Sequence, residues 1–171
     1  QTDLKWLYQT KNDVLLLSSS GTGAMDASLI NTCSPGDTIL VVDGGKFGER
    51  FAKIGKAFGV NVDTLKVTWG QAVAVSAIDE KLKQKDYRAV CVQASETSTG
   101  VEHPIKEIAA LVKNYPSTIA IVDAITALGV INIPTDEWGI DILICGSQKA
   151  LMLPPGLATL SVSDKAWLLA D

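Results

Sequence analysis

The chain has 171 residues, of which 47% are hydrophobic and 20% charged, and its net charge is −4, which suits one globular α/β domain. The acidic balance and the lack of basic blocks argue against a nucleic-acid partner, and no apolar run reaches the roughly 20 residues of a membrane span. The cysteines lack metal-ligand spacing and lie within or beside apolar runs, so we expect reduced, buried thiols, no metal and a cytoplasmic location: Cys33, Cys91 and Cys145.

The first predicted strand and helix are joined by a glycine loop. Residues 2–9 carry the apolar pattern of a helix end, residues 13–18 predict a short strand, and residues 24–30 predict a helix. The intervening loop, Ser20-Gly21-Thr22-Gly23, would point backbone N–H groups and the positive end of the helix at one place, as phosphate binding requires. The alternative is a tight turn in which Thr22 caps the helix.

The next unit repeats this scheme. A strand over 38–43 is followed by Gly44–Gly48, which opens a helix. Phe47 lies at this strand exit, where its ring could either stack on a cofactor or anchor the helix in the core. Two further elements carry no evident chemistry, namely an edge strand over 61–67 and an exposed, polar helix over 77–85.

A polar loop follows the next buried strand. The strand covers 89–93, and the hydroxyl groups of loop 94–100 could donate hydrogen bonds to a cofactor or substrate. Pro104 suits the first turn of a helix that runs to Tyr115. His103, the only histidine, is expected at a solvated loop position without a catalytic role.

Two apolar strands, over 117–122 and 140–145, end beside the most informative charged residues. Asp123 directly follows the first strand, and Lys149 lies shortly beyond the second. Ligands of open α/β sheets bind outside the carboxyl ends of the strands, so both side chains could face one ligand. An amine can condense with the aldehyde of pyridoxal 5'-phosphate and a carboxylate can keep its pyridine nitrogen protonated, so the pair suggests this cofactor.

The last predicted strand reverses the direction of the sheet. After a rigid turn at 153–156, the strand over 158–163 returns by a connection too short for a helix, so we expect antiparallel pairing. Ser163 is expected to cap a last helix over 164–169. No linker or repeat interrupts residues 1–171, which we interpret as one doubly wound domain cut from a longer chain.

Five motifs occur in the order found in class V aminotransferases, and they most closely resemble the alanine–glyoxylate and serine–glyoxylate branch: Ser20–Ala27, Gly45–Arg50, Glu96–Gly100, Val122–Ile125, and Gly146–Leu151 with Pro154–Gly156. This resemblance covers nearly the whole chain. It implies an α/β fold, the large, cofactor-binding domain of the aspartate-aminotransferase-like fold (fold type I). That domain has a mostly parallel seven-stranded sheet flanked by helices, with one strand antiparallel.

The resemblance also implies residue roles. Lys149 would hold pyridoxal 5'-phosphate as a Schiff base and, desolvated in the crevice, would later move a proton as a general base, while Asp123 would pair with the ring nitrogen. The other cofactor contacts would come from Thr22, Gly23, Ala24 and Gln148 at the phosphate, Phe47 and Ile125 on the two ring faces, and Thr97 at the polar edge. Phe47 and Ala24 depart from a tryptophan and a histidine seen in relatives, so the likeness selects no single substrate.

The implied activity is transamination of a small amino acid, alanine or serine, with the 2-oxo acid glyoxylate as acceptor. The resemblance implies a homodimer whose partner subunit completes the phosphate site. It also implies a C-terminal domain that supplies the arginine for the substrate carboxylate, so we expect this segment alone to be inactive.

Other functions remain open. The same core serves cysteine desulfurases and kynureninases, although a desulfurase needs a loop cysteine and all three cysteines are expected in strands or helices. A dinucleotide-binding oxidoreductase would require a third glycine after Gly23 and would leave Lys149 unexplained. A non-catalytic subunit that keeps the fold is the third alternative, which the presence of Asp123 and Lys149 disfavours.

Overall fold

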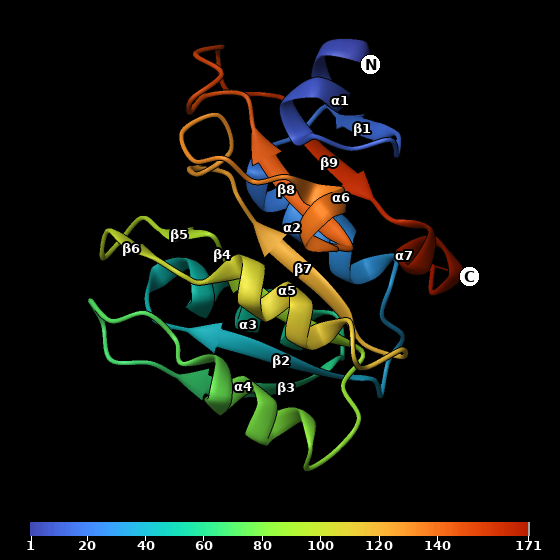
Figure 1. Cartoon of the computed structure of the whole chain (residues 1–171), viewed down its shortest axis with the longest axis vertical. Coiled ribbons are helices and arrows are strands. Elements are labelled where there is room, and N and C mark those ends of the chain that lie inside the picture. Colours follow the sequence, from blue (N-terminus) through green and yellow to red (C-terminus); the bar gives the residue numbers. More distant parts are fainter. Residues whose placement is uncertain (171) are drawn as a thin grey trace.

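The computed structural model describes residues 1–170 and contains a seven-stranded sheet (Figure 1). The strands lie in the order β1 (Val14–Leu17), β9 (Ala158–Val162), β8 (Ile142–Gly146), β7 (Ile119–Asp123), β4 (Ala89–Gln93), β2 (Thr38–Asp43) and β3 (Asn61–Lys66). Neighbours from β8 to β3 are parallel, whereas β9 is antiparallel to both β8 and β1. This confirms the predicted sheet, with its one antiparallel strand and its edge strand β3.

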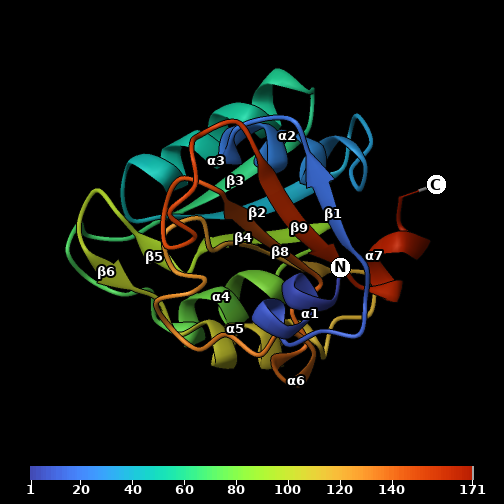
Figure 2. The same cartoon turned by 90° about the horizontal axis from the view of Figure 1, so that it is seen from above.

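Helices cover both faces of the sheet, as Figure 2 shows from above. One face is covered by α2 (Gly21–Ile30) and α3 (Lys46–Ala57). The other is covered by α1 (Thr2–Tyr8), α4 (Val75–Leu82), α5 (Ile105–Val112) and α6 (Thr135–Trp138). The last helix, α7 (Asp164–Leu168), lies beside the end of β9. Within residues 1–170, no helix combines the length and the hydropathy needed to cross a bilayer.

The continuous apolar runs follow from this double covering. In β4, Val90 and Val92 face one hydrophobic core, whereas Ala89 and Cys91 face the other, and all four side chains are fully buried. Successive side chains of a strand point to opposite faces, so a strand covered on both faces must be apolar at every position. Buried polar residues at strand ends, such as Asp123 at the end of β7, are exceptions to this pattern.

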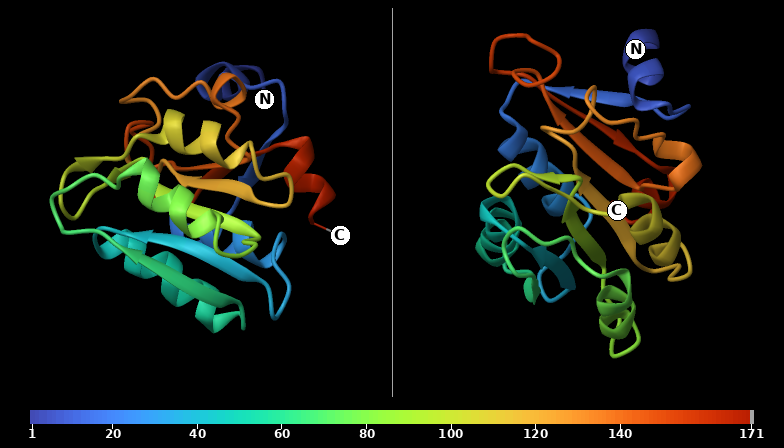
Figure 3. Two further views of the ribbon diagram at one scale, coloured as in Figure 1. Left: turned by 60° about the horizontal axis from the view of Figure 1, so that its bottom comes forward. Right: turned by 60° about the vertical axis from the view of Figure 1, so that its left-hand side comes forward.

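The polar loop after β4 contains a short hairpin that was not predicted. Strand β5 (Ser95–Glu96) pairs antiparallel with β6 (Val101–Glu102), and Gly100 adopts φ +70° before the return strand. Figure 3 shows from two directions that this hairpin stands at the end of the sheet to which the parallel strands point. Two-residue strands carry too little apolar alternation for a pattern to reveal them.

His103 corrects another expectation. Its side chain is only 2% exposed, and its Nδ1 accepts a hydrogen bond of 3.1 Å from the Val73 backbone N–H. Burial lowers the pKa of the imidazole, partly offset by the charge of Glu96. This hydrogen bond connects the segment before α4 to the loop before α5. Pro104, predicted in the first turn of α5, is the residue that directly precedes this turn.

The structure confirms one smaller prediction and corrects two others. Ser163 caps α7 as predicted, because its Oγ accepts the Ala166 N–H at 3.1 Å. The helix predicted over 77–85 is α4, which begins earlier and buries Ile78 and Leu82 instead of being exposed throughout. Cys33 lies half-buried in the segment after α2 rather than in a strand or helix, whereas Cys91 and Cys145 are buried in strands.

Candidate active site

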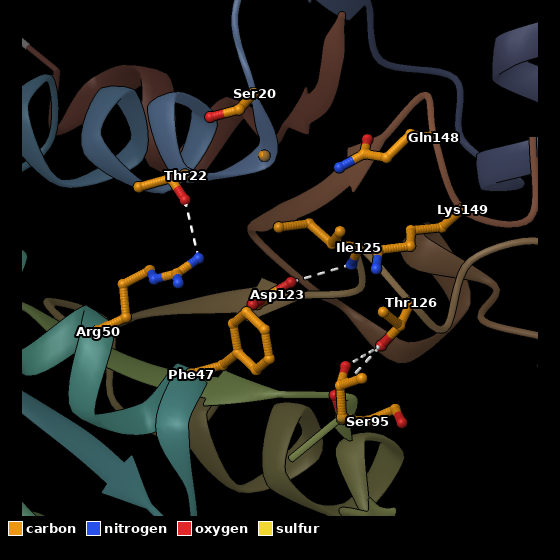
Figure 4. A pocket seen from close by; sticks show the side chains of 12 residues that line it. Ser20, Thr22, Phe47, Arg50, Ser95, Asp123, Ile125, Thr126, Gln148 and Lys149 are labelled. Atoms are coloured by element: carbon orange, nitrogen blue, oxygen red, sulfur yellow. Dashed lines mark hydrogen bonds between the residues drawn. The ribbon is translucent and has the colours of Figure 1, made fainter. Parts of the chain in front are cut away.

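A cavity of about 220 Å³ opens at the carboxyl ends of β7 and β8 and is bounded by the starts of α2 and α3 (Figure 4). Its lining consists of Ser20, Gly21, Thr22, Phe47, Arg50, Ser95, Thr97, Asp123, Ile125, Thr126, Gln148 and Lys149. The structure therefore brings together all the predicted site residues except Gly23 and Ala24. These segments are distant in the sequence and meet because parallel strands end at the same edge.

Asp123 and Lys149 reach this cavity from neighbouring strands. Asp123 ends β7 and is aligned with Ile144 of β8, and Lys149 lies in the turn that follows β8. The Asp123 side chain is only 5% exposed, and its Oδ1 accepts a hydrogen bond of 2.9 Å from the Ile125 N–H. We predicted that the amine of Lys149 is shielded from water. Lys149 is instead exposed, so residues 1–170 do not exclude water from it.

Burial raises the pKa of Asp123 to about 6. The Ile125 N–H lowers that pKa, the negative charge of Glu96 raises it, and the Arg50 guanidinium lowers it. A buried carboxylate with a raised pKa gains free energy from a cation placed beside it. The cavity therefore suits a ligand that presents a positively charged or protonated nitrogen to Asp123.

The start of α2 offers unused hydrogen-bond donors to the cavity. Among residues 1–170, no side chain caps this helix, and no acceptor bonds the backbone N–H groups of Gly21, Thr22 and Gly23. A Cβ at Gly21 would clash with Ile125, so the glycine allows the helix to begin against the cavity wall. Free N–H groups and the helix dipole make this end a suitable site for an anion.

Ala24 does not share this position. Its side chain is fully buried in the core, and its N–H donates to the Ser20 carbonyl at 3.3 Å. The alternative in which Thr22 caps α2 is also not observed, since Ser20 precedes the helix and Thr22 Oγ1 instead accepts a hydrogen bond of 3.0 Å from Arg50. The backbone N–H groups left free at this helix start are therefore those of Gly21, Thr22 and Gly23.

The start of α3, in contrast, is already occupied by side chains of the hairpin. Glu96 accepts the N–H groups of Phe47 and Gly48, and Ser98 Oγ accepts the N–H of Lys46. The Ser98 hydroxyl also donates to Glu96, so it is not aimed at the cavity as predicted for the loop hydroxyls. Of the two helix N-termini that border the cavity, that of α2 is therefore the one available to a ligand.

The cavity walls are apolar on two sides and polar between them. Phe47 and Ile125 supply the apolar surfaces, and the hydroxyl groups of Thr97 and Thr126 lie 3.0 Å apart in the same lining. Arg50 was not predicted; its guanidinium lies 4.8 Å from the centre of the Phe47 ring. Its position one helical turn after Phe47 is the sequence feature that could have identified it.

Comparison with known proteins places these features in a family. A family model described as Aminotransferase class-V matches residues 2–168. The "Soluble hydrogenase 42 kDa subunit" of Anabaena cylindrica is 49% identical over 168 residues, which cover 96% of this chain and 44% of that protein. An L-aspartate–glyoxylate aminotransferase of Paracoccus denitrificans is 36% identical over 166 residues, covering 95% and 42% respectively.

The solved structures agree with the fold. The crystal structure of an alanine–glyoxylate aminotransferase from Nostoc sp. matches with a TM-score of 0.95 and 30% sequence identity, and the match covers 99% of this chain and 45% of that one. The present chain thus spans somewhat less than half the length of the curated relatives it matches.

Proposed function

Because this chain belongs to the class V aminotransferase family, we propose that the protein uses pyridoxal 5'-phosphate to transfer an amino group from alanine or serine to glyoxylate. The observation that carries this proposal is the pair of Asp123 and Lys149. A buried carboxylate and a primary amine line one small cavity at the exits of adjacent strands. The first suits a protonated ring nitrogen, and the second suits an aldehyde carbon.

The chemistry of the cavity lining supports this cofactor. The cavity has a volume of about 220 Å³. Phe47 and Ile125 offer apolar surfaces to a ring. The N–H groups of Gly21, Thr22 and Gly23 together with the Gln148 amide would hold the phosphate, and Thr97 would face the polar edge of the ring.

The reaction assigns a distinct task to each charged residue. Pyridoxal phosphate, when bound, supplies an aldehyde that condenses with amines and a ring that accepts the electron pair left when Cα loses its proton. Asp123 would keep a proton on the ring nitrogen. Lys149 Nζ would provide the covalent attachment point and, once released, would act as the base that moves the Cα proton. Its exposure means that the bound ligand or protein outside residues 1–170 must exclude water from it.

The proposed acceptor is common to both glyoxylate aminotransferases named above, whereas their amino donors differ. A small donor needs little beyond a clamp for its carboxylate, and one methyl or hydroxyl group changes discrimination by only ~1–3 kcal/mol in an apolar pocket. We therefore propose overlapping use of alanine and serine, with aspartate as the competing donor.

A role as a non-catalytic subunit is the second candidate. The observation that favours it is the similarity to a protein named as a hydrogenase subunit. The convergence of Asp123, Lys149 and the open start of α2 favours catalysis, because assembly alone requires none of these groups to face one cavity. A desulfurase would need a mobile cysteine; Cys33, the one cysteine outside the strands, does not line the cavity.

Two further properties are proposed with this function. A homodimer would complete the phosphate site, since the cavity is open and the anion-binding donors from this chain come from one helix and Gln148. A cytoplasmic location would suit the three unpaired thiols, which an oxidising compartment would not preserve.

The attachment of the cofactor tests the proposal directly. Pyridoxal phosphate added to the purified full-length protein should give the visible absorbance of a lysine adduct, and borohydride should fix the cofactor to the peptide that contains Lys149. Lys149→Ala should abolish both the adduct and transamination while the protein stays folded. The matched control is Lys53→Ala, which removes an exposed lysine of α3 and should change neither measurement. Full turnover by Lys149→Ala would disprove the assignment.

A further inference from the structure

We propose that Glu96 is a positioning residue of this site: its buried carboxylate fixes Phe47 at the start of α3 and contributes a second negative charge to the surroundings of Asp123. Glu96 ends strand β5 and directly precedes Thr97, which lines the cavity. The inference deepens the proposed function and rests on it, because Phe47 and Asp123 matter here as the two residues that would hold the ring of the cofactor.

The geometry of the cap is the first argument. Glu96 is fully buried, and its Oε2 accepts the backbone N–H groups of Phe47 and Gly48, each at 3.1 Å. Its Oε1 accepts from the N–H and the hydroxyl of Ser98, at 3.2 and 2.6 Å, and Ser98 Oγ accepts the Lys46 N–H at 2.9 Å. The donors of the first turn of α3 are thus bound by one carboxylate and its neighbouring hydroxyl.

Close packing makes this cap a constraint on Phe47. A Cβ at Gly45 would clash with both Ser98 and Glu96, and a Cβ at Gly48 would lie 2.6 Å from the Val42 carbonyl oxygen. The helix start is therefore pressed against the end of β2 on one side and held by Glu96 on the other. A rotation of the first turn would move the Phe47 ring from the cavity wall.

The charge of Glu96 is the second argument. Among residues 1–170, no lysine or arginine forms an ion pair with it, so its charge is balanced only by N–H dipoles and a hydroxyl. The titratable groups that face Asp123 are Glu96 from β5, Arg50 from α3, Cys145 from β8 and Lys149 from the turn after β8. Of these four groups, Glu96 is the one that carries a carboxylate.

The two charged neighbours act on Asp123 in opposite directions. The charge of Glu96 raises the pKa of Asp123, and that of Arg50 lowers it. A carboxylate with a higher pKa accepts a stronger hydrogen bond from a protonated ring nitrogen. Glu96 would therefore strengthen the contact between Asp123 and the ring while its backbone contacts hold the stacking side chain.

Two substitutions at one position separate the charge from the cap. Glu96→Gln keeps the length of the side chain and removes the charge, whereas Glu96→Asp keeps the charge and shortens the reach to the Phe47 and Gly48 amides. The control is Glu102→Gln, which removes an exposed glutamate from the paired strand of the same hairpin. Each variant is measured without cofactor, by the titration of Asp123 and the hydrogen exchange of the two amides, and then by its affinity for pyridoxal phosphate.

Glu96→Gln should lower the pKa of Asp123, speed exchange at Phe47 and Gly48, and weaken cofactor binding about tenfold, on the scale of one lost charge-assisted cap. Glu96→Asp should retain the greater part of the Asp123 pKa shift but speed the same exchange and weaken binding by about fivefold. Glu102→Gln should match the wild type in all three measurements.

Unchanged Asp123 titration and cofactor affinity in Glu96→Gln, with only faster exchange, would reduce Glu96 to a structural cap and overturn the inference. If Glu96→Gln does not fold, wild-type cofactor affinity in Glu96→Asp would overturn it instead. Failure of the proposed function is distinguishable, because the wild type would then form no Lys149 adduct, while the two cofactor-free measurements would still decide whether Glu96 acts on Asp123 and Phe47.

Discussion

Asp123 shows how burial, rather than residue type, determines the chemistry of a side chain. An aspartate in water is ionised well below neutral pH, whereas burial raises the pKa of this one to about 6. The carboxylate can therefore bind a proton or a protonated nitrogen near neutral pH. The same residue type at Asp63 or Asp79, half-buried and bonded to lysines, has a pKa lowered from its usual value.

The first prediction concerns Asp123→Asn in the enzyme loaded with cofactor. We expect attachment at Lys149 to remain possible, because the amine is unchanged, while kcat falls about 10²- to 10³-fold since the amide cannot hold the ring nitrogen protonated. Steady-state kinetics and the borohydride test, run on the same sample, measure the two effects separately. A variant with wild-type kcat would show that Asp123 does not act through ring protonation.

The second prediction concerns the stability of the protein without cofactor. The folded-state pKa of Asp123 lies above its unfolded value of 3.8, so its contribution to stability is fully present below pH 3.8 and is lost as the pH rises through about 6. Asp123→Asn removes this loss. The difference in free energy of unfolding between Asp123→Asn and the wild type should therefore shift in favour of the variant by on the order of 3 kcal/mol between pH 4 and pH 8. Denaturant titrations at both pH values test this, and a difference that does not vary with pH would contradict the raised pKa.

At the scale of elements, α2 and α3 begin at the same edge of the sheet but serve different purposes. The start of α3 is closed by Glu96 and Ser98, whereas the start of α2 is left open beside the cavity. The two helices have the same dipole direction relative to the sheet, so the electrostatic preference for an anion is common to both. The hairpin of β5 and β6 decides which helix can receive it.

The third prediction concerns Gly21→Ala at the start of α2. The new methyl group would clash with Ile125, so either the helix start or the cavity wall must move, and we expect affinity for pyridoxal phosphate to fall by more than about tenfold. Absorbance titration measures the affinity. The control is Ala27→Gly, which weakens the same helix by about 1 kcal/mol without altering its N-terminus. Equal affinity losses in both variants would mean that helix stability alone, not the open terminus, governs binding.

At the scale of the whole molecule, the doubly wound topology is what makes the site possible. Strands β2, β4, β7 and β8 are parallel, so their carboxyl ends and the helices that follow meet at one edge. After the turn that carries Lys149, the chain reverses direction at this edge and forms β9, which runs antiparallel to β8. The resulting cavity has a volume of about 220 Å³ and is open to solvent.

The fourth prediction concerns the substrate class. Assays of alanine, serine, aspartate and cysteine as donors, with glyoxylate, 2-oxoglutarate and pyruvate as acceptors, should show glyoxylate as the preferred acceptor. Alanine and serine should differ by no more than about 10- to 200-fold in kcat/KM, the range that one small group supplies. A strong preference for aspartate with 2-oxoglutarate, or sulfide release from cysteine without transamination, would overturn the substrate assignment and leave the roles of Asp123 and Lys149 intact.

The sequence alone determined the succession of the seven strands of the main sheet and of every helix except α6, the antiparallel return of β9 and the meeting of Asp123 with Lys149. Each of these follows from local signals, since apolar runs reveal strands buried on both faces and parallel strands place their exits together. The tertiary structure alone decided that Glu96 caps α3, that His103 is buried, that Ala24 faces the core, and that Arg50 reaches Thr22. The physical reason is that hydrogen-bond partners such as Glu96 and Phe47 lie 49 residues apart, and no periodicity or propensity encodes a contact over that separation.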